Sequence, residues 1–170
     1  MGENLAVEGR MAVRTPMQWS RDRNAGFSDV RPGKLVRPIV EGAYGPEFVN
    51  VAAQRHDPNS LLSFMSLLTR RYRECPEFGW GAFEVLNQEH AAVLAHRSVL
   101  DDGSLIALHN FGDEAVTVPI RLKDCAPDAV LVDLLREDST TLDKGRAQLT
   151  LEAYGFRWLR VVDPRQRRLI

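Results

Sequence analysis

The sequence predicts an α+β fold in which a long irregular segment and one helix precede an antiparallel β-sandwich. Three observations support this prediction. Residues 1–57 are rich in Gly, Pro, Asn and Arg and keep neither a helical nor a strand period. Residues 58–75 repeat apolar side chains at spacings of three and four. From about residue 82 onwards the apolar period becomes two, which is typical of strands.

The irregular segment is much longer than the usual connection of about 4–6 residues inside a compact domain. A segment of this kind is typical of a functional loop, or of a domain whose other elements lie outside the sequence. Both interpretations remain open from the residues alone.

Residues 58–75 are expected to form one amphipathic helix. Asp57 can cap it, and Pro58 suits the first helical position because the N–H that proline lacks would be unpaired there. Pro76 and Gly79 are expected to end it. One face carries the apolar stripe Leu61, Leu62, Met65, Leu68 and Tyr72. Each such side chain gains roughly 1.5–3 kcal/mol on burial, so the stripe needs a larger partner surface than a small sandwich offers.

Seven short strands are predicted after the helix. Turn-forming runs such as Asp101-Asp102-Gly103 and Asp143-Lys144-Gly145 separate them. Short strands with regular turns are typical of a small antiparallel sandwich. The predicted strands are 82–86, 91–98, 104–110, 115–121, 129–135, 147–151 and 156–162.

Composition narrows the function classes. A formal net charge of −1 gives no global attraction to nucleic acid or to an anionic membrane, so neither is expected as a partner. The apolar runs are too short to span a bilayer. Residues 1–5 have neither the basic start nor the apolar stretch of a signal peptide, and the two cysteines form no disulfide framework. A cytoplasmic location is therefore expected.

The sequence contains no motif that predicts a catalytic nucleophile, a metal site or a cofactor site. Cys75 and Cys125 have no neighbouring histidine and are interpreted as small buried apolar residues. His96 and His109 flank a predicted turn and can face each other across a hairpin, but two imidazoles do not complete a zinc site. No metal and no cofactor are expected.

Paired carboxylates are the usual machinery of glycoside hydrolysis. Asp101-Asp102 and Glu137-Asp138 are adjacent in sequence, but both pairs fall in predicted turns, where acidic side chains favour local backbone hydrogen bonds. We therefore assign no catalytic residue to this chain.

Tryptophan faces can stack on sugar rings, and the chain has three tryptophans. Trp158 lies in a predicted strand, where core packing is favoured. Trp80 lies between two glycines and is expected to fill the junction between helix and sandwich. Trp19 lies in the irregular segment beside Gln18 and Arg14, where ligand contact and packing are equally plausible.

Six stretches resemble glycoside hydrolase family 13, the α-amylase superfamily, and within it trehalose synthases (maltose α-D-glucosyltransferases) and oligo-1,6-glucosidases. They occur in the family's order and cover essentially residues 1–162. The stretches are Met1-Gly2-Glu3-Asn4-Leu5, Val13-Arg14-Thr15-Pro16-Met17-Gln18-Trp19-Ser20, Asn24-Ala25-Gly26-Phe27-Ser28, Val49-Asn50-Val51-Ala52-Ala53-Gln54, Leu108-His109-Asn110-Phe111 and Leu151-Glu152-Ala153-Tyr154-Gly155-Phe156-Arg157-Trp158-Leu159.

The resemblance implies a division of the chain. Residues 1–78 correspond to the end of the catalytic TIM barrel, with the loop after strand eight and the last helix. Residues 79–163 correspond to the carboxyl-terminal all-β domain, and residues 164–170 form a tail. The three catalytic carboxylates of the family lie at barrel strands four, five and seven, which precede the position that matches Met1. None of them is carried over to this chain.

The resemblance also implies a substrate-binding role for Arg14, which matches an arginine that contributes to the sugar pocket. Gln18 and Trp19 are expected to support it, and the competing interpretation of Arg14 is an ion-pair residue that anchors the loop. The whole enzyme would interconvert maltose and trehalose by the retaining two-carboxylate route, or would hydrolyse a small α-glucoside as oligo-1,6-glucosidases do.

The chain alone is expected to be inactive and to meet small α-glucosides only within the full enzyme. Its expected partner is a chain that carries the rest of the barrel, or a second copy that covers the helix stripe. The alternative function is a non-catalytic module, in which the sandwich binds carbohydrate or only supports the barrel.

Overall fold

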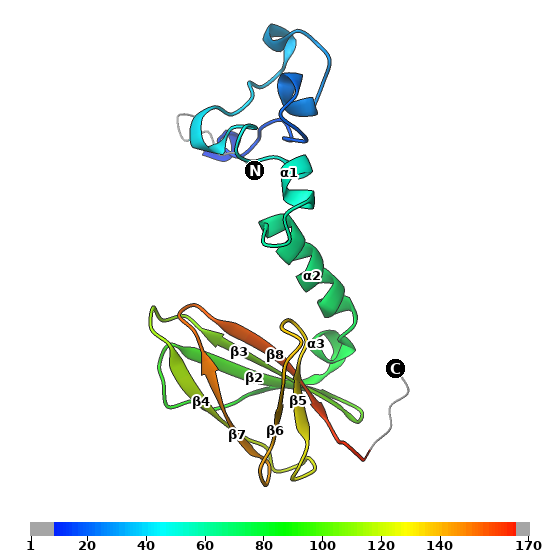
Figure 1. Cartoon of the computed structure of the whole chain (residues 1–170), viewed down its shortest axis with the longest axis vertical. Helices are drawn as coiled ribbons and strands as arrows, with labels where there is room; N and C mark the ends of the chain where they lie inside the picture. The colour runs from blue at the N-terminus through cyan, green and yellow to red at the C-terminus, as the bar shows by residue number, and fades with distance from the viewer. Residues whose placement is uncertain (1–8, 166–170) are drawn as a thin grey trace. The chain divides into compact units, whose positions relative to one another are not determined.

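The computed structural model describes residues 9–165, which form two compact units divided between Leu67 and Leu68. The stretch at residues 1–5 and most of the tail expected at 164–170 lie outside the described residues. The predicted α+β class is confirmed: the first unit is mainly irregular and the second contains an antiparallel sandwich (Figure 1). Within residues 9–165, no helix has the length and apolar character needed to cross a bilayer.

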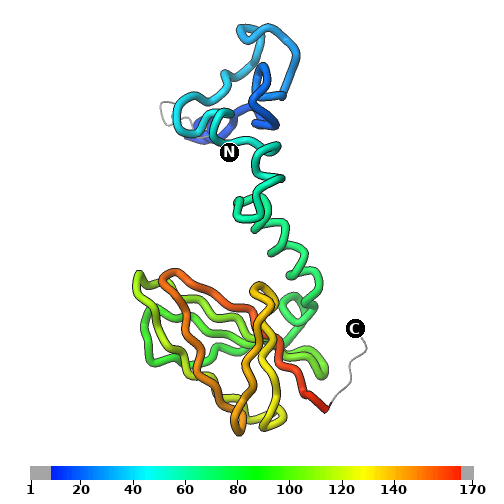
Figure 2. The backbone as a smooth tube through the Cα atoms, viewed as in Figure 1, coloured from blue at the N-terminus to red at the C-terminus, as the bar shows by residue number. Residues whose placement is uncertain are grey.

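The first unit has little regular structure, as predicted (Figure 2, blue to cyan). One α-helix lies inside the segment that shows no helical period. Asn50 accepts a hydrogen bond from the Ala53 N–H at 2.8 Å and so caps a short helix. The elements are the 3₁₀ helices η1 (Gly9–Met11), η2 (Arg23–Gly26), η3 (Pro32–Lys34) and η4 (Gly42–Tyr44) and the helix α1 (Val51–Arg55).

The prediction of one helix over 58–75 is wrong at both of its ends. Helix α2 spans Leu61–Arg73, and its first turn is capped by the Ser60 hydroxyl, which accepts from the Ser63 N–H at 3.2 Å. Asp57 instead accepts from the Asn59 N–H at 2.9 Å, which holds the preceding residues in a turn. This local bond competes with helix formation and delays the helix by one turn.

Pro76 does not only end α2; it also begins another helix. Cys75 leaves the helical region, with φ −122° and ψ 76°, and α3 (Pro76–Trp80) follows with proline in its first turn. Helix α3 packs on strands β2 and β3 of the sandwich. Trp80, which was expected to fill this junction, is instead 83% exposed.

Within the described part of the chain the sandwich has eight strands where seven were predicted, because the polar Ser-Thr-Thr run of β6 gives no alternating apolar signal. Every strand pair is antiparallel. One sheet has the order β1-β2-β3-β8-β5-β6, and the other pairs β4 with β7. The strands are β1 (Ala82–Val85), β2 (Val93–Leu100), β3 (Gly103–Asn110), β4 (Val116–Arg121), β5 (Val130–Asp133), β6 (Ser139–Thr141), β7 (Arg146–Leu151) and β8 (Phe156–Val162).

The two sheets enclose one apolar core. Alternate residues of β3, β5 and β8 point into it, because successive side chains in a strand lie on opposite faces. Its buried members are Ala95, Ile106, Leu108, Val118, Ile120, Leu122, Ala129, Leu131, Leu142, Leu149, Leu151 and Leu159.

The opposite face of the larger sheet carries rings. His96 and His109 lie diagonally across the β2–β3 ladder and stack, with ring centroids 6.2 Å apart and planes 12° from parallel. Trp158 packs on this same outer face, against Phe78 of α3 at 4.8 Å. The expectation that Trp158 lies in the core is therefore wrong, although the residue does pack within the protein.

Candidate functional site

The three predicted substrate-binding residues lie in one extended stretch of the first unit, but their environments differ. Arg14 is exposed, and its side chain forms no hydrogen bond or ion pair with any other residue in the range 9–165. Gln18 is buried, at 5% exposure, whereas Trp19 is 47% exposed. The backbone of this stretch has neither helical nor strand structure.

Gln18 fixes the stretch to more distant parts of the first unit. Its Nε2 donates to the carbonyl oxygens of Val49, at 2.5 Å, and Tyr44, at 3.1 Å. Its own carbonyl oxygen accepts from the Val51 N–H at 3.0 Å, and that of Trp19 accepts from Ala52 at 2.9 Å. The first two residues of α1 therefore donate the N–H groups that a helix start leaves unpaired to the Gln18–Trp19 backbone.

Gln18 also has an unsatisfied acceptor. Its Oε1 is buried and has no hydrogen-bond partner within residues 9–165. The amide orientation is fixed, because Nε2 faces two carbonyl oxygens and only a donor suits that position. A buried acceptor without a donor costs about 1–3 kcal/mol, so a donor from outside residues 9–165 would stabilise this position.

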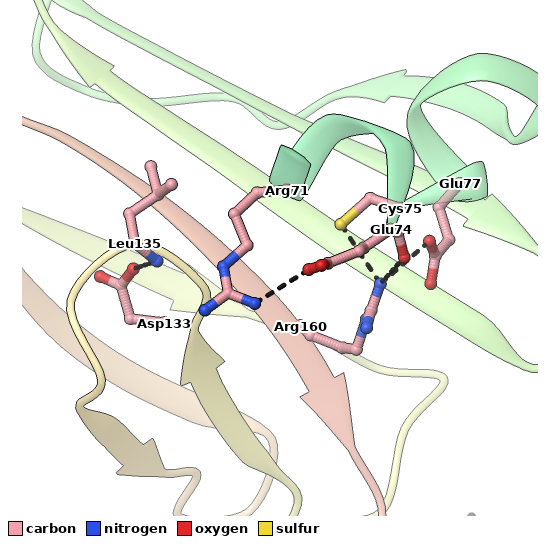
Figure 3. A network of polar contacts seen from close by, with 7 residues as sticks. All are labelled: Arg71, Glu74, Cys75, Glu77, Asp133, Leu135 and Arg160. Carbon is pink, nitrogen blue, oxygen red and sulfur yellow. Dashed lines mark hydrogen bonds and ion pairs between the residues drawn. The ribbon is translucent and has the colours of Figure 1, made fainter. Parts of the chain in front are cut away.

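The buried carboxylates of the second unit are engaged in ion pairs. One nitrogen of Arg160, Nη2, contacts the Glu74 carbonyl oxygen at 3.1 Å, Cys75 Sγ at 3.3 Å and Glu77 Oε2 at 3.3 Å (Figure 3). This cluster connects β8 to the turn between α2 and α3. Asp133 of β5 forms an ion pair with Arg157 of β8.

The acidic pairs named from the sequence lie in turns, as predicted. Asp101 and Asp102 form the exposed β2–β3 turn, and Glu137 and Asp138 lie between β5 and β6. Asp138 accepts from Arg157 at 2.6 Å, so its carboxylate serves an ion pair.

The cysteines and histidines do not form a reactive centre. Burial raises the pKa of Cys75 and of Cys125, which favours the thiol over the nucleophilic thiolate. Burial lowers the pKa of His96, and burial and the neighbouring His96 lower that of His109. Over residues 9–165 there is no group of three or more His, Cys, Asp or Glu side chains able to hold a metal ion.

A second polar site in the sandwich has no counterpart in the sequence predictions. Arg97 of β2 is buried, its Nε donates to Ser104 at 2.7 Å, and its Nη1 donates to both carboxylate oxygens of Asp124 at 2.7 and 2.9 Å. The hydrogen bond from Arg97 lowers the pKa of Asp124. A cavity of about 360 Å³ adjoins this pair. Periodicity gave no sign of it, because Arg97 lies at an inward position that apolar residues usually occupy.

Comparison with known proteins agrees with this architecture. The family model for the sucrose hydrolase-like, C-terminal domain matches residues 103–160. A trehalose synthase of Pimelobacter sp. (strain R48) is 34% identical over 178 residues, covering 96% of this chain and 30% of the relative. A trehalose synthase of Thermus thermophilus is 36% identical over 160 residues, covering 92% and 16%.

This chain is also similar to a solved structure. The trehalulose synthase MutB from Pseudomonas mesoacidophila MX-45 matches with a TM-score of 0.63 and 28% identity, over 93% of this chain and 27% of that one. The chain thus spans less than a third of the length of each of these relatives.

Proposed function

We propose that this chain, which belongs to the carboxyl-terminal part of the trehalose synthase-like enzymes of glycoside hydrolase family 13, forms part of a maltose/trehalose-interconverting α-glucosyltransferase. In this proposal the first unit supplies a wall of the sugar pocket, and the sandwich supports the barrel of the full enzyme. The two carboxylates that perform the retaining reaction, about 5–5.5 Å apart, come from elsewhere in the enzyme.

The observation that carries the proposal is the combination of a fixed backbone with unpartnered side-chain groups. Among the described residues Arg14 has no side-chain partner and Gln18 Oε1 has no donor, and Trp19 is half-exposed, yet hydrogen bonds from α1 hold the backbone of Gln18 and Trp19. A planar guanidinium suits bidentate contact with a carboxylate or with vicinal sugar hydroxyls. We assign sugar contact to Arg14 and Trp19, and assign to Gln18 the role of holding the wall.

Helix α2 supports the proposal that further protein covers this chain. None of its residues is buried, and Leu61, Met65 and Tyr72 of the predicted stripe are exposed. Burying large apolar side chains of this kind contributes roughly 1.5–3 kcal/mol each. We propose the barrel part of the enzyme as the covering surface, and self-association through the stripe as the competing outcome.

Two assays test the proposal. The purified chain is incubated with maltose, trehalose and p-nitrophenyl α-glucoside, and no product above a buffer blank is expected. It is then mixed with a protein carrying the barrel part of a trehalose synthase, where binding and conversion of maltose to trehalose are expected. Turnover by the chain alone contradicts the proposal, and glucose without trehalose in the mixture favours an α-glucosidase.

Arg14→Lys tests the assigned contact within this mixture. Lysine keeps the charge but loses the planar fork, so conversion should fall while binding of the two proteins persists. Arg37→Lys, at another exposed arginine of the first unit, is the matched control. Equal activity of both variants contradicts the role of Arg14.

A second candidate function rests on exposed rings of the sandwich unit. Trp80 is 83% exposed, and Phe83, three residues further, is also exposed. Rings of this kind offer apolar faces to maltooligosaccharides, which favours the carbohydrate-binding module. Titration calorimetry before and after Trp80→Ala, with the exposed Tyr154→Ala as control, tests it. Binding that only the Trp80 change abolishes supports a module, and no binding by the wild type excludes it.

A further inference from the structure

We infer that the turn Asn24-Ala25-Gly26 is a positioning device that sets the backbone of Trp19. The inference rests on the proposed function only in naming a glucosyl ring as what Trp19 meets. Its geometric part depends on contacts inside the first unit.

The turn is left-handed at three consecutive residues. Asn24 has φ 51° and ψ 33°, Ala25 has φ 57° and ψ 28°, and Gly26 has φ 68°. L-residues avoid this region because Cβ approaches the following carbonyl oxygen, and runs of such residues are rare. Alanine has no polar side chain that favours it, so surrounding contacts must impose this conformation.

Asn24 supplies part of those contacts. Its buried side-chain amide donates to the carbonyl oxygens of Ser28, at 2.6 Å, and Val30, at 2.7 Å. Its own carbonyl oxygen accepts from the Phe27 N–H at 3.0 Å. Asparagine is also among the few residues that visit the left-handed region readily.

The turn acts directly on Trp19. The Ala25 carbonyl oxygen accepts from the N–H groups of Trp19, at 2.8 Å, and Ser20, at 3.1 Å. A Cβ at Gly26 would lie 2.6 Å from Ser20 Oγ and 3.3 Å from Trp19 Cβ, and φ is +68°, so a side chain here would be strained and would displace the Ser20 hydroxyl. The turn therefore holds the Trp19 N–H, while the Ala52 N–H of α1 donates to the Trp19 carbonyl oxygen.

The result is an exposed ring on an immobilised backbone. A large apolar side chain on such a backbone is pre-organised, and pre-organisation reduces the entropy lost when a ligand binds. Ala25 itself is buried and cannot meet the ligand, which makes the turn a positioning element.

Fluorine NMR of the chain labelled with 5-fluorotryptophan tests the inference. The three tryptophans give three resonances, assigned by single Trp→Phe changes. Asn24→Asp keeps a residue that tolerates the left-handed region but turns the two donated bonds into repulsion between oxygens. A shifted and narrowed Trp19 resonance is expected, with Trp80 and Trp158 unchanged. Asn59→Asp, at an exposed asparagine of the same unit, is the control.

Ala25 variants keep the test valid if Asn24→Asp unfolds the first unit. Ala25→Gly retains the left-handed turn, so the Trp19 resonance should stay at its wild-type position. Ala25→Val, with a β-branched side chain that avoids positive φ, should shift it. A Trp19 resonance that stays fixed in Asn24→Asp, or moves equally in both Ala25 variants, overturns the inference.

The proposed contact between Trp19 and a glucosyl ring is tested by a separate measurement. Maltose is added to the chain bound to the barrel part of a trehalose synthase, and the Trp19 resonance is expected to move. If the variants behave as expected but maltose has no effect, the positioning role stands and the proposed sugar contact of Trp19 fails.

Discussion

Arg160 of β8 and Glu77 of α3 form an ion pair at 3.3 Å, in which the Glu77 side chain is 4% exposed and the Arg160 side chain 28% exposed. The pair joins two segments 83 residues apart in sequence. It holds the short helix α3 on the sheet, and its charges cannot be separated without leaving Glu77 buried and unpaired.

Arg160→Ala should therefore lower the free energy of unfolding by about 2–4 kcal/mol, because an isolated buried carboxylate loses both its counter-charge and its hydrogen bond. The free energy of unfolding is measured by urea denaturation monitored by circular dichroism. Arg71→Ala is the control, since Arg71 and Glu74 form a more exposed i,i+3 pair worth about 0.5 kcal/mol or less. Equal losses in the two variants would show that burial of Glu77 does not govern the cost.

The stacked pair His96 and His109 predicts acid sensitivity. Burial lowers the pKa of each histidine in the folded state below the ordinary value of 6.5. At pH values between the folded-state pKa and 6.5, the unfolded chain therefore binds more protons than the folded chain. The contribution to stability is complete above about pH 7 and is lost as the pH falls through 6.5 towards the folded pKa values. Unfolding free energies at pH 7.5 and 5.5 should differ less in His96→Phe/His109→Phe than in the wild type. His56→Gln, at an exposed histidine, should leave the difference unchanged.

Gly145 should tolerate no side chain. It has φ +75°, and a Cβ there would lie 2.3 Å from the Leu122 carbonyl oxygen. This backbone atom cannot move away without distorting the paired strands β4 and β7. Gly145→Ala should lower the free energy of unfolding by about 2–4 kcal/mol. Gly33→Ala meets nothing within 4 Å at an ordinary φ and should change it by less than about 0.5 kcal/mol. A tolerated Gly145→Ala would contradict the described turn.

Substitutions of two leucines distinguish an effect on folding stability from an effect on association with the barrel part. Leu131→Ala empties a fully buried core position and should cost about 2–4 kcal/mol in urea unfolding. Leu61→Ala, at a side chain 70% exposed on α2, should change stability by less than about 0.5 kcal/mol. Leu61→Ala should nevertheless weaken binding to the barrel part in titration calorimetry. Unchanged binding counts against the stripe as the covered surface.

Several features of the fold were predictable because they depend on neighbours in the sequence. Alternation of apolar side chains located seven of the eight strands found within residues 9–165, and the order of six motifs indicated the family. The boundaries of α2 were not predictable, because Asp57 and Ser60 both suit a cap and only their actual hydrogen bonds decide between them. β6 was missed because three polar residues at a sheet edge carry no periodic signal.

The candidate site divides in the same way. The sequence by itself determined which residues form the loop around Arg14, Gln18 and Trp19, since a specific run of side chains identifies it. Only the tertiary structure decided that Gln18 is buried with no partner for its Oε1 among residues 9–165, that Asn24 and Ala25 are left-handed, and that Trp19 stays exposed. For Gln18 the physical reason is that its amide bonds to the carbonyl groups of Tyr44 and Val49, which no local pattern encodes. For the turn the bonds are between near neighbours, from Asn24 to Ser28 and Val30, but the residue types alone do not select them.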